Sequence, residues 1–204
     1  MNSFSKLVLS DEEQQLVNNR EWILTKRVIL DKVQQLLGNV SVIQKEIIQQ
    51  EQANLPAAVL QSDAKISKGE NYLQLPFLIL DYPRCFAVEN IFAVRTMFWW
   101  GNFFSITLHL SGIYKQNGEE KIIAALDEIR QKDFYLCISK TEWHHHFDDD
   151  NYVSLKQKSN EEAEEIIRQQ QFIKLAVKFP LTAWNDISLL LEKSFTDIIK
   201  LVRD

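Results

Sequence analysis

The sequence predicts an α+β fold, with an antiparallel β-sheet of about five or six strands and helices packed mainly on one face. Two observations lead to this class. Half-buried strand patterns follow one another through short connections, and Gly101-Asn102 joins two such runs as a hairpin turn does. A doubly wound parallel sheet would need a crossover helix between most strands, which this hairpin contradicts.

The length of 204 residues suits a single domain, residues 1–204, with enough chain to bury a sizeable core. We expect an N-terminal helical layer at 1–53 and a sheet with further helices at 72–204. The segment Asn54–Asn71 has weak periodicity and scattered Pro, Ser and Gly. We therefore expect it to connect the helical layer to the sheet.

The first helix is predicted to begin at a capping box, in which Glu13 stands three residues after Ser10. Its apolar pattern runs to Gly38-Asn39, a typical helix stop, and a second helix is expected at Val40–Gln52. Within the first helix, Leu or Ile recurs every seven residues, at Leu16, Ile23, Leu30 and Leu37. Asn19 and Lys26 make the complementary seam polar, so packing on its own domain is favoured over a coiled coil.

The rest of the chain alternates between strand and helix patterns. Strands are expected at 72–80, 134–139, 152–155 and 172–179, and helices at 119–131, 159–170 and 184–202. Pro76 indicates an edge position for the first of these strands, because proline cannot donate to the hydrogen-bond ladder. Residues 81–84 look like a turn. Six residues on apolar faces are predicted to share one core: Trp22, Leu30, Trp99, Leu108, Leu175 and Trp184.

The hairpin at Phe92–Ser111 is the most informative segment, because its turn fixes which side chains share a face. A two-residue or four-residue closure gives the pairs Trp100–Phe103, Thr96–Thr107 and Val94–His109. This register leaves Arg95 as one charge on an otherwise apolar face. A buried guanidinium needs a partner, which would be an acid such as Glu89 or an anionic ligand.

Candidate ligand-binding residues gather on this hairpin, where hydroxyls, an indole, an imidazole and a guanidinium lie close in sequence. They are Arg95, Thr96, Trp100, Thr107 and His109. A lone histidine in an apolar strand is more often structural than catalytic. No nucleophile motif accompanies it, so no catalytic residue is assigned and cofactor-binding residues remain unknown.

The run from Trp143 to Asp150 holds three histidines next to three aspartates. His144 and His146 would point the same way on a strand, and Asp148 could complete a metal shell. Adjacent histidines cannot all project to one side, and no further ligand is identified. We therefore expect an exposed, mobile segment without metal, and a metal-dependent enzyme using His144–Asp150 with His109 is the alternative.

Composition excludes several classes. The five glycines form neither GxGxxG nor GxxxxGK[ST], so nucleotide binding through those loops is not expected. The net charge of −5 argues against a nucleic-acid binder, and the chain lacks an apolar run long enough to span a bilayer. Two cysteines without a CxxC pair suit a reducing compartment, and we expect a cytoplasmic protein.

The predicted function is that of a small-ligand-binding or protein-interaction domain without catalysis and without a cofactor. Its partner would be a small ligand or another protein, with no nucleic acid and no membrane. Homodimerisation is a further possibility, because four aromatic residues surround the hairpin turn at 99–104. Whether the protein is an enzyme stays open at this point.

Overall fold

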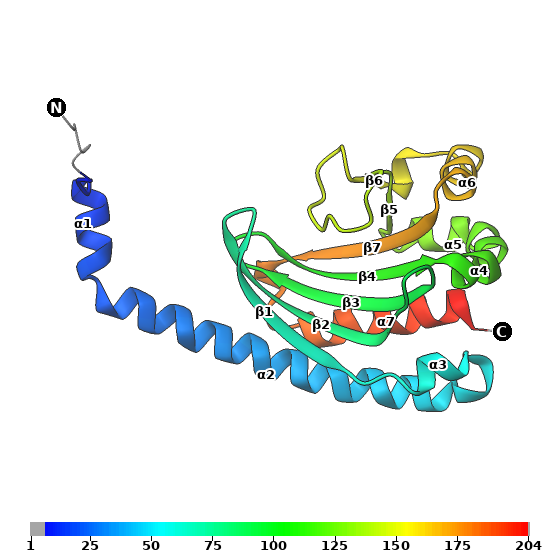
Figure 1. Ribbon diagram of the computed structural model, residues 1–204, viewed down its shortest axis with the longest axis horizontal. Helices are drawn as coiled ribbons and strands as arrows, with labels where there is room; N and C mark the ends of the chain where they lie inside the picture. Colours follow the sequence, from blue (N-terminus) through cyan, green and yellow to red (C-terminus); the bar gives the residue numbers. More distant parts are fainter. Residues whose placement is uncertain (1–6, 204) are drawn as a thin grey trace.

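A computed structural model describes residues 7–203 of the chain, and its centre is a seven-stranded antiparallel sheet (Figure 1). The strand order is β1-β2-β3-β4-β7-β5-β6. The strands are β1 (Lys65–Tyr72), β2 (Leu75–Phe86), β3 (Ile91–Trp99), β4 (Phe103–Ser111), β5 (Tyr135–Cys137), β6 (Tyr152–Ser154) and β7 (Phe172–Pro180). The predicted α+β class with an antiparallel sheet is confirmed, and the sheet has more strands than expected.

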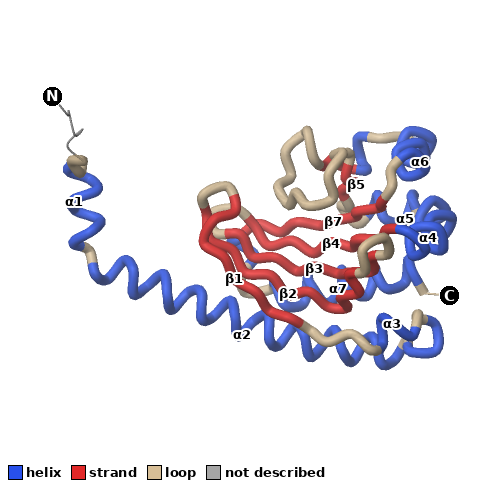
Figure 2. Tube along the Cα trace, in the orientation of Figure 1, coloured by secondary structure: helices blue, strands red, loops and turns tan. Residues whose placement is uncertain are grey.

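The helices lie mainly below the sheet and at one end of it (Figure 2). They are α1 (Asp11–Asn18), α2 (Arg20–Gln50), α3 (Ala57–Leu60), α4 (Gly112–Ala124), α5 (Leu126–Gln131), α6 (Asn160–Gln169) and α7 (Ile187–Val202), with 3-10 turns at 52–54, 155–157 and 181–183. The helices α2 and α7 pack against one face of the sheet. Within residues 7–203, no helix combines the length and apolar character that crossing a bilayer requires.

The N-terminal helices differ from the prediction at two points. The capping box is present, since the Ser10 hydroxyl accepts from the Glu13 amide at 3.2 Å and the Glu13 carboxylate accepts from the Ser10 amide at 2.7 Å. The chain then breaks at Asn19, which caps a new helix by accepting from the Trp22 amide. The stop predicted at Gly38-Asn39 is wrong, because α2 continues through it to Gln50.

The segment predicted to be a connector contains most of β1, and the turn predicted at 81–84 is part of β2. The sequence pattern does not predict β1, because this edge strand is rich in polar residues and one of its sides faces solvent. Pro76 does not mark an edge strand, since β2 pairs with both β1 and β3. It stands next to the start of the strand, where a missing amide is tolerated.

The hairpin register is one residue away from the prediction. Trp99 pairs with Phe103, so the loop has three residues with Gly101 at φ 73°, and the Asn102 amide donates to the Trp99 carbonyl at 3.0 Å. Arg95 consequently pairs with Thr107, whereas Thr96 pairs with Ile106. The predicted pairs are wrong. Arg95 shares its face of the sheet with Thr107 and His109, whereas Thr96 lies on the opposite face with Ile106.

The main core lies between the sheet and the helices, where β2, β3, β4 and β7 meet α2 and α7. Leu108 and Leu175 are fully buried there, and Trp184 and Leu30 pack against it. Trp99 is buried in a separate cluster on the other face with Met97. Trp22 is 50% exposed, so the expectation of one core for all six residues is wrong.

Candidate functional site

The face of the sheet opposite α2 and α7 is covered by the chain between β5 and β6 (Figure 1). We call residues 138–151 the covering segment. This segment has no helix. Its His145 side chain contacts β3, its Trp143 side chain contacts β4, and two of its backbone carbonyls accept hydrogen bonds from β7. The contacts under this segment combine buried charged and polar groups with two small apolar clusters, whereas the helix-covered face carries the main apolar core.

The sheet register brings the polar residues of this face together. Asp81, Arg95 and Thr107 form one row across β2, β3 and β4, because each pairs with the next. The neighbouring row holds His109 on β4 opposite Lys174 on β7. Three of the five predicted ligand-binding residues, Arg95, Thr107 and His109, therefore converge. They are joined by Asp81, which the sequence predicts to lie in a turn, and by Lys174, which is not among the predicted site residues.

Arg95 is held by two partners. Its Nε and Nη2 donate to the two carboxylate oxygens of Asp81 at 2.7 and 3.0 Å, and its Nη1 lies 2.9 Å from His145 Nε2. A guanidinium has no lone pair to offer, so His145 Nε2 must be the acceptor and the ring is neutral. Burial and the nearby Arg95 charge lower the pKa of His145 well below its usual value, in agreement with that contact.

Lys174 fixes the backbone of the covering segment. Its side chain is among the most deeply buried in the protein, and Nζ donates to the carbonyls of Glu142 at 2.8 Å and His144 at 2.6 Å. Burial lowers the pKa of Lys174 to about 8, and the charge of Arg95 acts in the same direction. The lysine thus fixes two backbone carbonyls of the segment at the cost of a buried amine.

His109 lies under the indole of Trp143, with the two ring centres 5.9 Å apart in an edge-to-face arrangement. Burial, together with the positive charges of Lys174 and Arg95, lowers the pKa of His109 to about 3. Its Nε2 lies 3.4 Å from a Glu142 carboxylate oxygen, a long contact for a hydrogen bond. The neutral ring therefore acts as a packed part of the face.

The polar residues of this face mostly satisfy one another, and the cavity left between them holds about 10 Å³, close to the size of one water. The site is therefore filled by the covering segment. The other two predicted ligand residues lie elsewhere. Thr96 is on the helix-covered face, where its hydroxyl accepts from Gln44, and Trp100 lies in the hairpin loop against Phe98.

The histidines and aspartates of the covering segment divide by burial. His146 is 8% exposed and His145 is mostly covered, whereas His144 and the three aspartates are exposed. The expectation of an exposed segment is therefore wrong for its middle. Phe147 explains this, because its ring stacks on Tyr152 at 4.6 Å and draws the neighbouring residues inward.

The backbone around His146 is held from two sides. The Tyr72 hydroxyl accepts from the amides of His145 at 2.6 Å and His146 at 3.0 Å. The buried Asn151 side chain donates to the His146 carbonyl, while the Asn151 amide donates to the Asp148 carbonyl at 2.9 Å. These contacts fix the loop from His146 to Asn151 as one compact turn.

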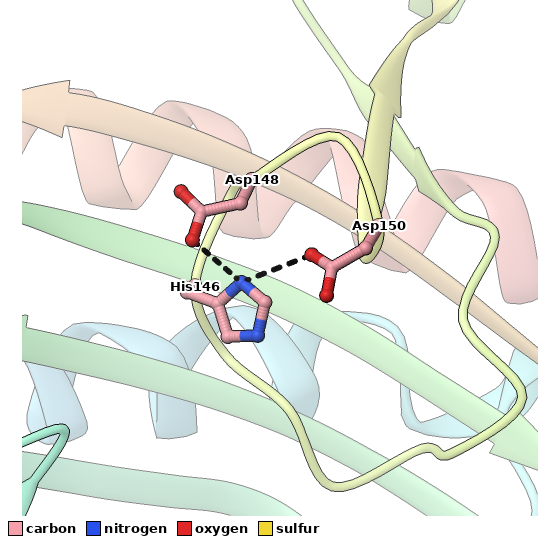
Figure 3. A group of neighbouring side chains, drawn as sticks. All are labelled: His146, Asp148 and Asp150. Atoms are coloured by element: carbon pink, nitrogen blue, oxygen red, sulfur yellow. Dashed lines mark ion pairs between the residues drawn. The ribbon is translucent and has the colours of Figure 1, made fainter.

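This turn brings together His146, Asp148 and Asp150 (Figure 3). His146 Nδ1 lies 3.3 Å from Asp148 Oδ2 and 3.7 Å from Asp150 Oδ1. In the described part of the chain, residues 7–203, these three side chains form the one group of His, Cys, Asp or Glu whose possible metal-ligand atoms all lie within 4.8 Å of one another. Of the predicted metal candidates, His146 and Asp148 belong to it, Asp150 replaces His144, and His109 lies in the polar face.

A larger cavity of about 700 Å³ opens beside the polar face. The covering segment contributes one wall through residues 138–143, and Ile166 with residues 169–172 forms the other. Glu142 and Trp143 border both this cavity and the small one under the segment. Mixed aromatic, hydroxyl and amide lining is typical of small-molecule sites.

A second candidate region consists of α1 and the first turns of α2, which project away from the rest of the protein (Figure 1). We call residues 11–32 the arm. None of its residues is buried, and the first buried residue of the described chain is Val33. Its large apolar side chains at least 38% exposed are Leu16, Val17, Trp22, Ile23, Leu24 and Val28.

The arm continues a stripe that is buried further along the same helix. Val33, Leu37, Val40, Gln44 and Ile48 form the buried side of α2. Counting back at 3.6 residues per turn places Trp22 and Leu30 on that same side. Lys26 lies there too, and its Nζ reaches Glu70 Oε2 of β1 at 2.7 Å. The protein body ends before the apolar stripe does.

Comparison with known proteins gives no relative from which a function could be inferred: no family model, no curated protein and no solved structure matches the chain.

Proposed function

We propose that this chain is a protein-interaction domain that self-associates through its arm, with the arm of a second copy as the partner. The observation that carries the proposal is the exposure of Trp22 and Ile23. They lie on the apolar stripe of α2, and this stripe is buried in the core from Val33 onward. A contiguous exposed apolar surface on a folded protein is typical of an interaction site.

Helix energetics support a partner for the arm. Isolated helices shorter than about 12–15 residues are marginal in water, and most helix stability comes from packing of an apolar side. The α1 helix has eight residues, none of them buried. A second helix laid along the arm would cover the side chains of Leu16, Trp22 and Ile23 in both copies.

The charge pattern favours an antiparallel pair. Residues 11–25 carry four acidic side chains and one basic one, whereas residues 26–32 carry three basic side chains and one acidic one. An antiparallel pair places the acidic end of each arm beside the basic end of the other. A parallel pair would place like charges together, which is unfavourable.

The proposal is tested by the mass of the protein in solution, measured by light scattering during size-exclusion chromatography. We expect the unaltered chain to be a dimer and Ile23→Asp to be a monomer, because a charge in the middle of the helix pair is costly. Val42→Asp is the matched control, since Val42 is 56% exposed on the same α2 helix while Ile23 is 46% exposed. It should leave the dimer intact.

Three results would contradict the proposal. The first is an unaltered chain that is monomeric at high protein concentration, and the second is a dimer that both aspartate variants disrupt equally. The third is binding of the arm to neutral lipid vesicles by a monomeric chain, which would make the arm a membrane-surface helix.

Small-ligand binding is a second candidate function, favoured by the cavity of about 700 Å³ beside Trp143. Trp143 is exposed at its wall and offers an aromatic surface, while Gln169, Gln170 and Gln171 offer amide donors and acceptors. Ligand-observed NMR with a library of small polar compounds tests this candidate. Hits whose signals persist with Trp143→Ala, or no hits at all, would exclude this cavity as the site.

A further inference from the structure

The group formed by His146, Asp148 and Asp150 contains a buried polar atom without a hydrogen-bond partner. His146 Nδ1 is inaccessible to solvent, and neither aspartate oxygen accepts a hydrogen bond from it. A buried nitrogen left in this state costs free energy, so natural proteins rarely keep one without reason. Nδ1 points between the two carboxylates in Figure 3.

We propose that His146, Asp148 and Asp150 bind a divalent transition-metal ion of the zinc type. One imidazole nitrogen and two carboxylate oxygens make a mixed donor set that suits Zn²⁺ or Mn²⁺. Ca²⁺ and Mg²⁺ prefer shells made of oxygen, so an imidazole at the centre of the group disfavours them. The ion would use the lone pair of Nδ1, which otherwise has no hydrogen-bond partner.

The distances in the group fit a shared ion. Zinc bonds of about 2.0–2.2 Å in a tetrahedral shell place neighbouring ligand atoms roughly 3.3–3.6 Å apart. His146 Nδ1 lies 3.3 Å from Asp148 Oδ2 and 3.7 Å from Asp150 Oδ1, so both pairs need only small shifts. The exposed side of the group leaves a fourth position for water.

The surrounding residues hold this group in shape before any ion binds. The contacts of Tyr72 and Asn151 fix the backbone on both sides of His146. Phe147 lies between His146 and Asp148 in the chain, and its ring packs on the ring of Tyr152. Such outer contacts orient metal ligands and reduce the entropy lost on binding.

Metal uptake by protein prepared without a histidine tag tests the site. Equilibrium dialysis against Zn²⁺, followed by elemental analysis, should give one ion per chain. Asp148→Asn and Asp150→Asn should each weaken binding by at least roughly 10–100-fold, the loss typical even for an outer-shell partner. Both side chains are exposed, so these isosteric changes leave the fold intact.

Asp149→Asn is the matched control, because it removes the same charge between the two ligands but lies outside the group. It should change the affinity for Zn²⁺ by less than about threefold, as expected for screened surface charge. Equal losses in all three variants would mean loose attraction of cations to an acidic loop and would overturn the proposal. So would Ca²⁺ binding tighter than Zn²⁺, or no uptake.

The metal proposal and the proposed self-association fail independently. The Ile23→Asp monomer should bind Zn²⁺ as the unaltered chain does, because the covering segment makes its contacts within one chain. A monomer that takes up no ion would overturn this inference alone.

Discussion

The two faces of the sheet are closed by different physical means. On the face covered by α2 and α7, apolar side chains such as Leu108 and Phe195 make most of the contacts, and the hydrogen bond from Gln44 to Thr96 is a buried polar contact among them. On the other face, Arg95 and Lys174 bind the covering segment through charges and backbone carbonyls. Apolar packing is non-directional, whereas polar contacts require one geometry and one protonation state.

This contrast assigns different roles to the faces. The apolar face supplies most of the stability, because burial of apolar area is the dominant favourable contribution to folding. The polar face adds less net stability, since each buried charge loses its hydration. It does specify where the covering segment lies, and therefore where His146 is placed.

The largest effect should come from the apolar face. Leu108→Ala is expected to lower the free energy of unfolding by about 2–5 kcal/mol, because Leu108 is fully buried and a cavity would remain. Leu189→Ala is the matched control on the exposed side of α7 and should cost far less. Urea denaturation of both variants measures the difference. Equal losses would place Leu108 outside the core.

Acid should weaken the polar face. The folded-state pKa of His109 is about 3, against 6.5 in an unfolded chain. The unfolded state alone takes up the proton between these values, so stability is present above pH 6.5 and is lost as the pH falls toward 3. From pH 7 to pH 5 this single group accounts for about 2 kcal/mol.

The measurement is urea denaturation at pH 7 and at pH 5. His109→Gln should reduce the difference in the free energy of unfolding between the two pH values. Part of this difference should remain, because the pKa of His145 is also lowered in the folded protein. Leu108→Ala should leave the difference unchanged, because it alters only the apolar face. A His109→Gln chain with the full pH dependence would show that another group is responsible.

A smaller global effect is expected for Lys174→Met, about 1–2 kcal/mol, because two carbonyls lose their donor while a buried charge is removed. Its main consequence should be local. Amide hydrogen exchange should become faster from Glu142 to Phe147, where the segment loses its anchor. Lys193→Met, an exposed position on α7 on the other face of the sheet, should not have this effect. Unchanged exchange in both variants would contradict the anchoring role.

The smallest effect should come from the arm, which neither face covers. Asp11→Lys combined with Glu12→Lys should weaken the dimer roughly several-fold, as exposed charge pairs contribute little. Mixing this variant with Arg27→Glu combined with Lys32→Glu should restore association. Recovery identifies the antiparallel pair, whereas two variants that weaken the dimer but do not recover on mixing would exclude it.

Much of the fold could be predicted from the sequence, because local patterns determine it. The capping boxes at Ser10 and Ser159 fix two helix starts, and the alternation along β7 identifies a strand. The hairpin register could not be fixed in this way. Gly101 is compatible with loops of two, three or four residues, and a difference of one residue exchanges the faces.

The candidate sites depended on distant partners, which local patterns do not reveal. Arg95 and His145 are 50 positions apart in the chain, and so no spacing rule could join them. Burial of His146 follows from the stacking of Phe147 on Tyr152, which is likewise a tertiary contact. The sequence predicts a buried Trp22 because its stripe continues into Val33, but the Trp22 side chain is 50% exposed in the structure.

The edges of the sheet restrict how copies of this chain can meet. The outer strand β1 carries Lys65 and Lys68 on exposed positions, and the opposite edge, β6, has three residues. Charged or very short edge strands resist the addition of further strands, a common protection against aggregation. A chain whose arm cannot pair should therefore remain a dispersed monomer instead of stacking into fibrils through its sheet.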